Sequence, residues 1–220
     1  MTAIGLYQDL VFPPGPGSRP HVAINMVATI DGKTISGERN EPVMDLGSSV
    51  DHATMRNLEF AAGAVLIGAE TLRATPKLHY DEQVTRMVAT RIGNLPWDHR
   101  FFTDAGTVFV LCPDRARLPL ELSSTWIELT DWQSALGSLR QQHGVDALLV
   151  EGGSELNAQL LSADLVDELF LTISPRIKLG RDVPTFAGGE PLDRELLKLF
   201  QLTSCNSVQD EVFLRYRRFA

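Results

Sequence analysis

The chain has 220 residues and a mass of 24.3 kDa, which is enough for one domain with a sizeable core. Its net charge of −8 disfavours nucleic acid or an anionic membrane as the main partner. Cys112 and Cys205 lie far apart and outside any CxxC pattern, so no zinc site, other metal site or disulfide framework is indicated. No apolar run is long enough to span a bilayer. We expect a single cytoplasmic domain over residues 1–220, with an irregular proline- and glycine-rich segment in 1–20.

Apolar patterning predicts strands alternating with helices. The first strand is expected over 21–29, where apolar residues recur at every second position, and a helix follows from a capping-box candidate at 48–51 to about Ala62. The other expected elements, in chain order, are strands at 64–68, 86–90, 107–112 and 125–129, a helix from Thr130 or Asp131 to about Gln142, a strand at 147–150, a helix with Leu156, Leu160 and Leu161, and strands at 168–173 and 211–216.

This alternation predicts an α/β fold, a three-layer sandwich with a central, mostly parallel sheet and helices on both faces. In such sheets, ligands bind beyond the carboxyl ends of the strands. The segment Glu151-Gly152-Gly153-Ser154 comes directly after a buried strand and opens a helix. Glycine lets a ligand approach the backbone closely, and a helix N-terminus favours an anion, so this turn is a candidate phosphate site. The alternative is a turn that only closes a strand-to-helix connection.

Three segments carry a resemblance to a known family. They are Asn25-Met26-Val27-Ala28-Thr29-Ile30-Asp31-Gly32-Lys33, Ala64-Val65-Leu66-Ile67-Gly68-Ala69-Glu70-Thr71-Leu72 and Val150-Glu151-Gly152-Gly153-Ser154-Glu155-Leu156. In this order and spacing, the chain resembles the pyrimidine reductase of riboflavin biosynthesis. That reductase forms the C-terminal half of bifunctional deaminase-reductases and has a dihydrofolate-reductase-like fold. The chain has no His-x-Glu or Pro-Cys-x-x-Cys motif, so zinc-dependent deamination is not expected.

The resemblance implies hydride transfer from NADPH to a ribosylamino-pyrimidine 5′-phosphate, which opens the ribose to a ribityl chain, in a homodimeric enzyme. The catalytic residues that it implies are Asn25, Asp31 and Glu151. The residues implied to bind the substrate are Asn25, Ser48, Arg56 and Glu151. The residues implied to bind the cofactor are Ala28, Gly68, Thr71, Thr90, Arg91, Gly152, Gly153, Ser154, Glu155 and Leu156. Among these, Thr90 and Arg91 suit the 2′-phosphate of NADPH, since a hydroxyl and a guanidinium can both bind a dianion.

Several residues also have simpler interpretations. Asp31-Gly32 is a typical turn dipeptide, and a carboxylate at Glu151 also stabilises a helix N-terminus. The loop at 41–49 lacks the tryptophan of the family's usual segment. Arg56 is offset from the usual place of a helix arginine, which Glu59 occupies. Two alternatives therefore stay open: a reductase of dihydrofolate or another pteridine on the same fold, and a non-catalytic nucleotide-binding relative.

Overall fold

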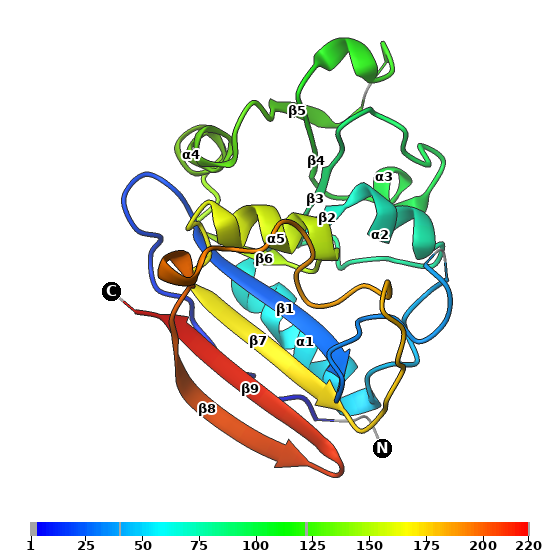
Figure 1. Ribbon diagram of the computed structural model, residues 1–220. Helices are drawn as coiled ribbons and strands as arrows, with labels where there is room; N and C mark the ends of the chain where they lie inside the picture. Colours follow the sequence, from blue (N-terminus) through cyan, green and yellow to red (C-terminus); the bar gives the residue numbers. More distant parts are fainter. Residues whose placement is uncertain (1–3, 40, 122, 220) are drawn as a thin grey trace.

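The computed structural model describes residues 4–39, 41–121 and 123–219, which contain a nine-stranded sheet of order β5-β4-β3-β2-β6-β1-β7-β9-β8 (Figure 1). The strands are β1 (His21–Thr29), β2 (Ala64–Gly68), β3 (Thr85–Ala89), β4 (Val108–Cys112), β5 (Thr125–Glu128), β6 (Ala147–Val150), β7 (Glu168–Ser174), β8 (Phe200–Val208) and β9 (Glu211–Arg218). The helices are α1 (Ser49–Ala62), α2 (Ala69–Ala74), α3 (Arg100–Thr103), α4 (Trp132–His143) and α5 (Ser154–Ser162), with short 3-10 turns at Arg115–Arg117 and Arg194–Leu196.

The predicted three-layer α/β architecture is confirmed. The strands from β5 to β7 pair in parallel, and only β9 and β8 are antiparallel additions at one edge. One apolar cluster packs α4 and α5 on one face of the sheet, and a second packs α1 and α3 on the other. Figure 1 shows α5 in front of the sheet and α1 behind it. Burial on both faces explains the continuous apolar runs of β2, β4 and β6.

The expected elements agree with the structure to within about two residues, but the sequence prediction missed β8, α2 and α3. β8 is a mostly exposed outer strand, so it has no apolar alternation to reveal it. The capping box was also wrong in detail. Ser48 caps α1 by accepting from the backbone of Val50 and Asp51. However, it is the Glu211 carboxylate, from β9, that accepts from the Ser48 backbone N–H, at 2.8 Å.

An ionic network joins the amino ends of β1 and β7 to β9. Glu168 is fully buried and accepts hydrogen bonds from Arg215 Nε at 2.5 Å and Arg217 Nε at 2.9 Å, with His21 Nε2 at 3.3 Å. Burial alone would raise the pKa of Glu168, but the hydrogen bonds from His21, Arg215 and Arg217 outweigh it and lower that pKa to about 2. The network therefore holds a charged carboxylate inside the fold at neutral pH.

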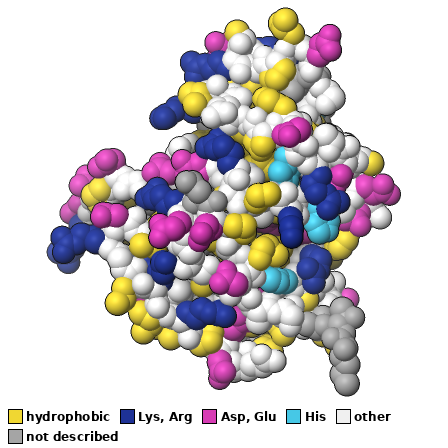
Figure 2. All heavy atoms as spheres, turned by 90° about the vertical axis from the view of Figure 1, so that its right-hand side faces the viewer, with side chains coloured by type: hydrophobic (Ala, Val, Ile, Leu, Met, Phe, Trp, Pro, Cys, Tyr) yellow, Lys and Arg dark blue, Asp and Glu magenta, His cyan; other side chains and the backbone are white. Residues whose placement is uncertain are grey.

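Charges of both signs are mixed on one face of the molecule (Figure 2). Figure 2 shows Lys and Arg side chains lying among Asp and Glu side chains over one face of the molecule, so no single sign of charge covers it. Among the described helices, none combines the length and apolarity that crossing a bilayer requires. The described His, Cys, Asp and Glu side chains form no group of three or more that could hold a metal ion.

Candidate active site

The site begins where β6 stops short of its two neighbours. Val150, the last residue of β6, pairs with Ile24 on one side and with Leu66 on the other, and both β1 and β2 continue beyond these points. The chain after β6 stays in this gap. The Glu151 N–H donates to the Leu66 carbonyl at 3.0 Å, and the Gly152 carbonyl accepts from Gly68 at 2.8 Å. Residues that follow β6 are thus held at the carboxyl edge of the sheet, where ligands bind in α/β proteins.

Glu151 and Asn25 lie on the same face of the sheet, the one that α1 covers. Along β6, Leu148 and Val150 belong to the α5-side cluster, while Leu149 belongs to the α1-side cluster, so the next residue, Glu151, points to the α1 side. On β1 the same alternation places Asn25 on that side. Because Ile24 pairs with Val150, the two polar residues follow each other in register on adjacent strands. The structure therefore brings together the two residues expected to face the substrate.

Two residues that the sequence prediction did not include complete this group. The Tyr80 hydroxyl donates to Glu151 Oε2 at 2.7 Å, and Tyr80 is only 6% exposed. Glu59, also 6% exposed, reaches Glu151 from α1. The second oxygen of Glu151, Oε1, is buried and lacks a hydrogen-bond partner among the described residues. An acceptor in this state is suited to a ligand N–H or to a proton held by a neighbour.

Burial raises the pKa values of all three groups. For Glu59, burial comes first and the charge on Glu151 adds to it, so its pKa lies far above the usual carboxyl range. Burial likewise raises the pKa of Glu151, although hydrogen bonds to its charged form partly offset the effect. Burial and then the charge on Glu151 raise the pKa of Tyr80, so its hydroxyl stays protonated and donates. The pKa of Glu151 is raised to about 7 and that of Glu59 to about 9, so near neutral pH the site is a titrating carboxyl group beside a neutral acid and a phenol.

The glycine turn and the start of α5 form the second part of the site. A side chain at Gly68 would lie 3.4 Å from the Gly153 nitrogen, and one at Gly153 would lie 3.4 Å from Thr71 Oγ1, so the segments after β2 and β6 meet closely. The Gly152–Gly153 peptide bond is cis. No side chain caps α5, so the N–H groups of its first turn are open to an anionic ligand. These residues include the predicted Ser154, Glu155 and Leu156.

Thr90 and Arg91 lie farther along the same edge, at the end of β3. Gly68 pairs with Ala89, which places Thr90 beside the start of α2. The buried Thr90 hydroxyl accepts from the Gly93 backbone at 3.1 Å, whereas the Arg91 side chain is exposed. The Arg117 guanidinium donates to the Arg91 backbone carbonyl. Because β1, β6, β2 and β3 are neighbours, the predicted cofactor residues form one line across the sheet edge.

Three predicted residues are placed differently from the Glu151 group. The Asp31 carboxylate accepts hydrogen bonds from Thr29 Oγ1 at 2.6 Å and from the backbone N–H groups of Lys178 and Leu179. These hydrogen bonds, the one from Thr29 most of all, lower the pKa of Asp31 to about 2. It thus anchors the turn after β1 to the segment after β7. The Ser48 hydroxyl donates to Glu211 and caps α1. Arg56 is exposed, whereas Glu59 on the same helix points inward.

A segment after β7 lies across this edge and was not expected to take part. The Thr34 N–H donates to Pro184, and the Asn157 side chain donates to Phe186 at 2.8 Å. Gly188 donates to the Ser154 carbonyl at 3.2 Å. The segment 184–188 therefore joins the turn after β1 to the first turn of α5, and Figure 1 shows it running back across the sheet from the end of β7.

Glu59 had a sequence signal, but Tyr80 and 184–188 had none. Glu59 follows Met55 by four residues and precedes Ala62 by three, so it interrupts the apolar stripe of α1 with a charge. A charged residue on the buried face of a helix calls for a partner. Tyr80 and 184–188 lie in irregular segments, where no periodicity indicates which side chains point inward.

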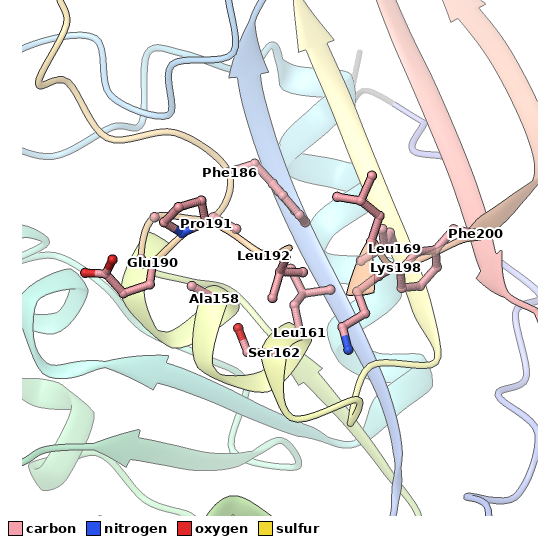
Figure 3. Close-up of a pocket in the computed structure, with 14 residues that line it drawn as sticks. Ala158, Leu161, Ser162, Leu169, Phe186, Glu190, Pro191, Leu192, Lys198 and Phe200 are labelled. Carbon is pink, nitrogen blue, oxygen red and sulfur yellow. The ribbon is translucent and has the colours of Figure 1, made fainter. Parts of the chain in front are cut away.

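A hollow of about 400 Å³ lies on the other face, between α5 and the segment 186–200 (Figure 3). Phe186, Leu192 and Phe200 contribute to its mostly apolar lining, with Lys198 at one end. It contains neither Asn25 nor Glu151, so it is separate from the polar group described above.

Comparison with known proteins agrees with this arrangement. A family model described as the RibD C-terminal domain matches residues 20–214. Two similar curated proteins, from Aquifex aeolicus and Methanothermobacter thermautotrophicus, are named 2,5-diamino-6-ribosylamino-4(3H)-pyrimidinone 5′-phosphate reductase. The first is 26% identical over 189 residues, 78% of this chain and 84% of that protein. The second is 28% identical over 191 residues, 80% of this chain and 87% of that protein.

Solved structures show the same fold. Acinetobacter baumannii RibD superposes with a TM-score of 0.78 at 21% identity, over 92% of this chain and 59% of that chain. Riboflavin biosynthesis reductase Rib7 of Saccharomyces cerevisiae superposes with a TM-score of 0.69 at 16% identity, over 94% of this chain and 93% of that chain. The chain thus spans less than two thirds of the length of RibD. The expected dihydrofolate-reductase-like fold class is confirmed.

Proposed function

The chain belongs to the RibD C-terminal domain family, and from that premise we propose that it is an NADPH-dependent reductase of riboflavin biosynthesis. Its proposed substrate is 2,5-diamino-6-ribosylamino-4(3H)-pyrimidinone 5′-phosphate, the compound in the names of two relatives. The observation that carries the proposal is the pairing of Asn25 with Glu151 at the carboxyl edge of the sheet, on the face opposite α5. A nucleotide-binding relative without catalysis would have no use for two half-buried polar side chains on neighbouring strands at this edge.

The residues present fit a dinucleotide cofactor. The uncapped start of α5 offers N–H groups to a pyrophosphate, and the segments after β2 and β6 meet closely beside it at Gly68 and Gly153. Bound NADPH would supply the hydride. Ala28 lies near the carboxyl end of β1, at the same sheet edge as the glycine turn, and is the residue proposed to adjoin the nicotinamide. The protein's own contribution is then to position the substrate and stabilise charge.

On the substrate side, Glu151 accepts hydrogen bonds from amino or ring N–H groups of the pyrimidine, while Tyr80 fixes its orientation through Oε2. Asn25 offers both a donor and an acceptor beside it. A fixed carboxylate in a partly buried site binds N–H donors more strongly than water does. Together these groups hold the ring so that the ribosylamino carbon faces the edge of β1.

The proposal is tested by offering the purified protein NADPH with three substrates: the diaminopyrimidinone, its deaminated uracil counterpart and dihydrofolate. We expect NADPH absorbance to fall with the first, together with formation of a ribityl product. Turnover of dihydrofolate alone would make the protein a pteridine reductase. Cofactor binding without turnover of any of the three would contradict a catalytic function.

NADPH is expected to bind more tightly than NADH, because the exposed Arg91 guanidinium offers a cation to the 2′-phosphate in a protein with a net charge of −8. Arg91→Ala should weaken NADPH binding by about tenfold, the equivalent of one charged hydrogen bond, and leave NADH binding unchanged. Fluorescence titration of both cofactors measures this. Equal affinities of the wild-type protein for the two would refute the assignment.

We also expect a homodimer formed through the late strands. Near the outer strand β8, the exposed fractions of Leu197, Leu199 and Leu202 are 60%, 71% and 48%, and an unpaired strand edge with apolar side chains favours association. Light scattering at micromolar concentration should give twice the chain mass of 24.3 kDa. A mass near that of one chain would show that the expectation is wrong.

A further inference from the structure

Glu59 is a buried acid with no evident structural partner. Its side chain is 6% exposed, and no side chain among the described residues donates a hydrogen bond to its carboxyl group. Its position on α1 is not a cap, since α1 begins at Ser49 and ends at Ala62. A buried carboxyl group without a cationic partner destabilises a fold unless it is neutral or is used.

The neighbouring Glu151 has a carboxylate oxygen that no hydrogen-bond donor in the described part of the chain fills. Its Oε2 accepts from Tyr80, but its Oε1 is buried and lacks a partner among the described residues. The two carboxyl groups lie within side-chain hydrogen-bonding reach of each other, and Glu151 Oε1 is an unfilled acceptor there. A single proton on Glu59 would fill it, because a carboxylic acid donates where a carboxylate cannot.

We propose that Glu59 is a positioning residue that shares one proton with Glu151, so that the pair carries a single negative charge and Glu151 is fixed where the substrate ring binds. The proton is held because two adjacent buried carboxylates repel each other strongly. With the pair fully deprotonated, Glu151 turns away from its partner and presents its oxygens poorly. The identity of the substrate rests on the proposed function, but the shared proton does not.

The surrounding charges are consistent with one retained proton. Tyr80 donates to Glu151, and Asp51, also on α1, adds negative charge near it. The exposed Arg56 favours the charged form of Glu59, but its effect is smaller than those of burial and Glu151. Neither carboxyl group accepts a hydrogen bond from a Lys or Arg side chain among the described residues.

The first test is the pH profile of kcat/KM for the wild type, Glu59→Gln and Glu59→Ala, with exposed Glu128→Gln as the matched control. The amide of Glu59→Gln donates at every pH. We therefore expect it to stay within about threefold of the wild type at pH 7 and to lose the wild-type decline at alkaline pH. Glu59→Ala should raise KM by about tenfold with little change in kcat. NADPH affinity should be unchanged throughout.

Either of two results would overturn the proposal: an alkaline decline in Glu59→Gln identical to that of the wild type, or wild-type kinetics in Glu59→Ala. The second test needs no substrate. A carboxyl group with a raised pKa in the folded state contributes stability that is lost as pH rises through that pKa. The melting temperature of Glu59→Gln relative to the wild type should therefore increase by about 5 °C from pH 6 to pH 9.

An unchanged difference in melting temperature between the two pH values would refute the shared proton. If the wild type reduces none of the three substrates, the proposed function fails, yet this second measurement still decides whether Glu59 holds the proton. The two hypotheses can therefore fail separately.

Discussion

Glu151→Gln is expected to lower kcat/KM for the ribosylamino-pyrimidine by about 100-fold at pH 7, which corresponds to about 2–3 kcal/mol of lost transition-state stabilisation. The substitution keeps the shape of the side chain but removes the charge, and it places an N–H₂ group where an acceptor is needed. NADPH affinity should hardly change, because the cofactor residues lie beyond the glycine turn and along β2 and β3. Steady-state kinetics and fluorescence titration measure the two effects separately.

Two variants make this result specific to Glu151. Tyr80→Phe removes only the hydrogen bond to Glu151 Oε2, so it should lower kcat/KM by about tenfold, less than Glu151→Gln does. Glu128→Gln makes the same chemical change at an exposed position on β5 and should have no effect. Wild-type activity in Glu151→Gln would remove the residue from the mechanism.

Glu168→Gln is expected to destabilise the fold by about 3–5 kcal/mol, a fall in melting temperature of about 10 °C, at neutral pH. Glu168 is fully buried, and its charge neutralises Arg215 and Arg217. Because its pKa is lowered to about 2 in the fold, its contribution is present above the ordinary carboxyl pKa and is lost as pH falls toward 2. The melting temperature of the variant should therefore fall less steeply than that of the wild type as the pH is lowered.

Thermal unfolding of both proteins between pH 2 and pH 7 measures this difference. Glu168 lies at the amino end of β7, at the opposite end of the strands from Glu151, so kcat of the folded variant should stay close to that of the wild type. Glu128→Gln again serves as the exposed control. If the melting temperature of Glu168→Gln equals that of the wild type at pH 7, the network makes no net contribution to the stability of the fold.

The fold could be predicted from sequence wherever burial leaves a pattern. β2, β4 and β6 are buried on both faces, so each reads as an unbroken apolar run, and α4 carries an Asp131 cap. β8 could not be recognised, because its side chains are mostly exposed and only backbone pairing with β9 defines it. α2 has six residues and no side-chain cap, so neither periodicity nor a start signal indicates it.

The site was predictable to a more limited extent. The position of Glu151 after β6 follows from the rule that ligands bind beyond the carboxyl ends of parallel strands, and Asn25 is in register with it. Tyr80 comes from an irregular segment whose path only the packed structure defines. Asp31 shows the opposite case, since its side chain is fully engaged in joining two turns. Long-range contacts of this kind leave no local trace in a sequence.

The most direct test of the central claim is the fate of the hydride. The protein is incubated with the diaminopyrimidinone ribosylamino phosphate and NADPH that carries deuterium at one face of the nicotinamide C4, and then with the opposite isomer. With one of the two isomers, the account predicts a ribityl product that carries a single deuterium at C1′, detected by mass spectrometry and NMR. A product without deuterium from both isomers, or no ribityl product at all, would contradict it.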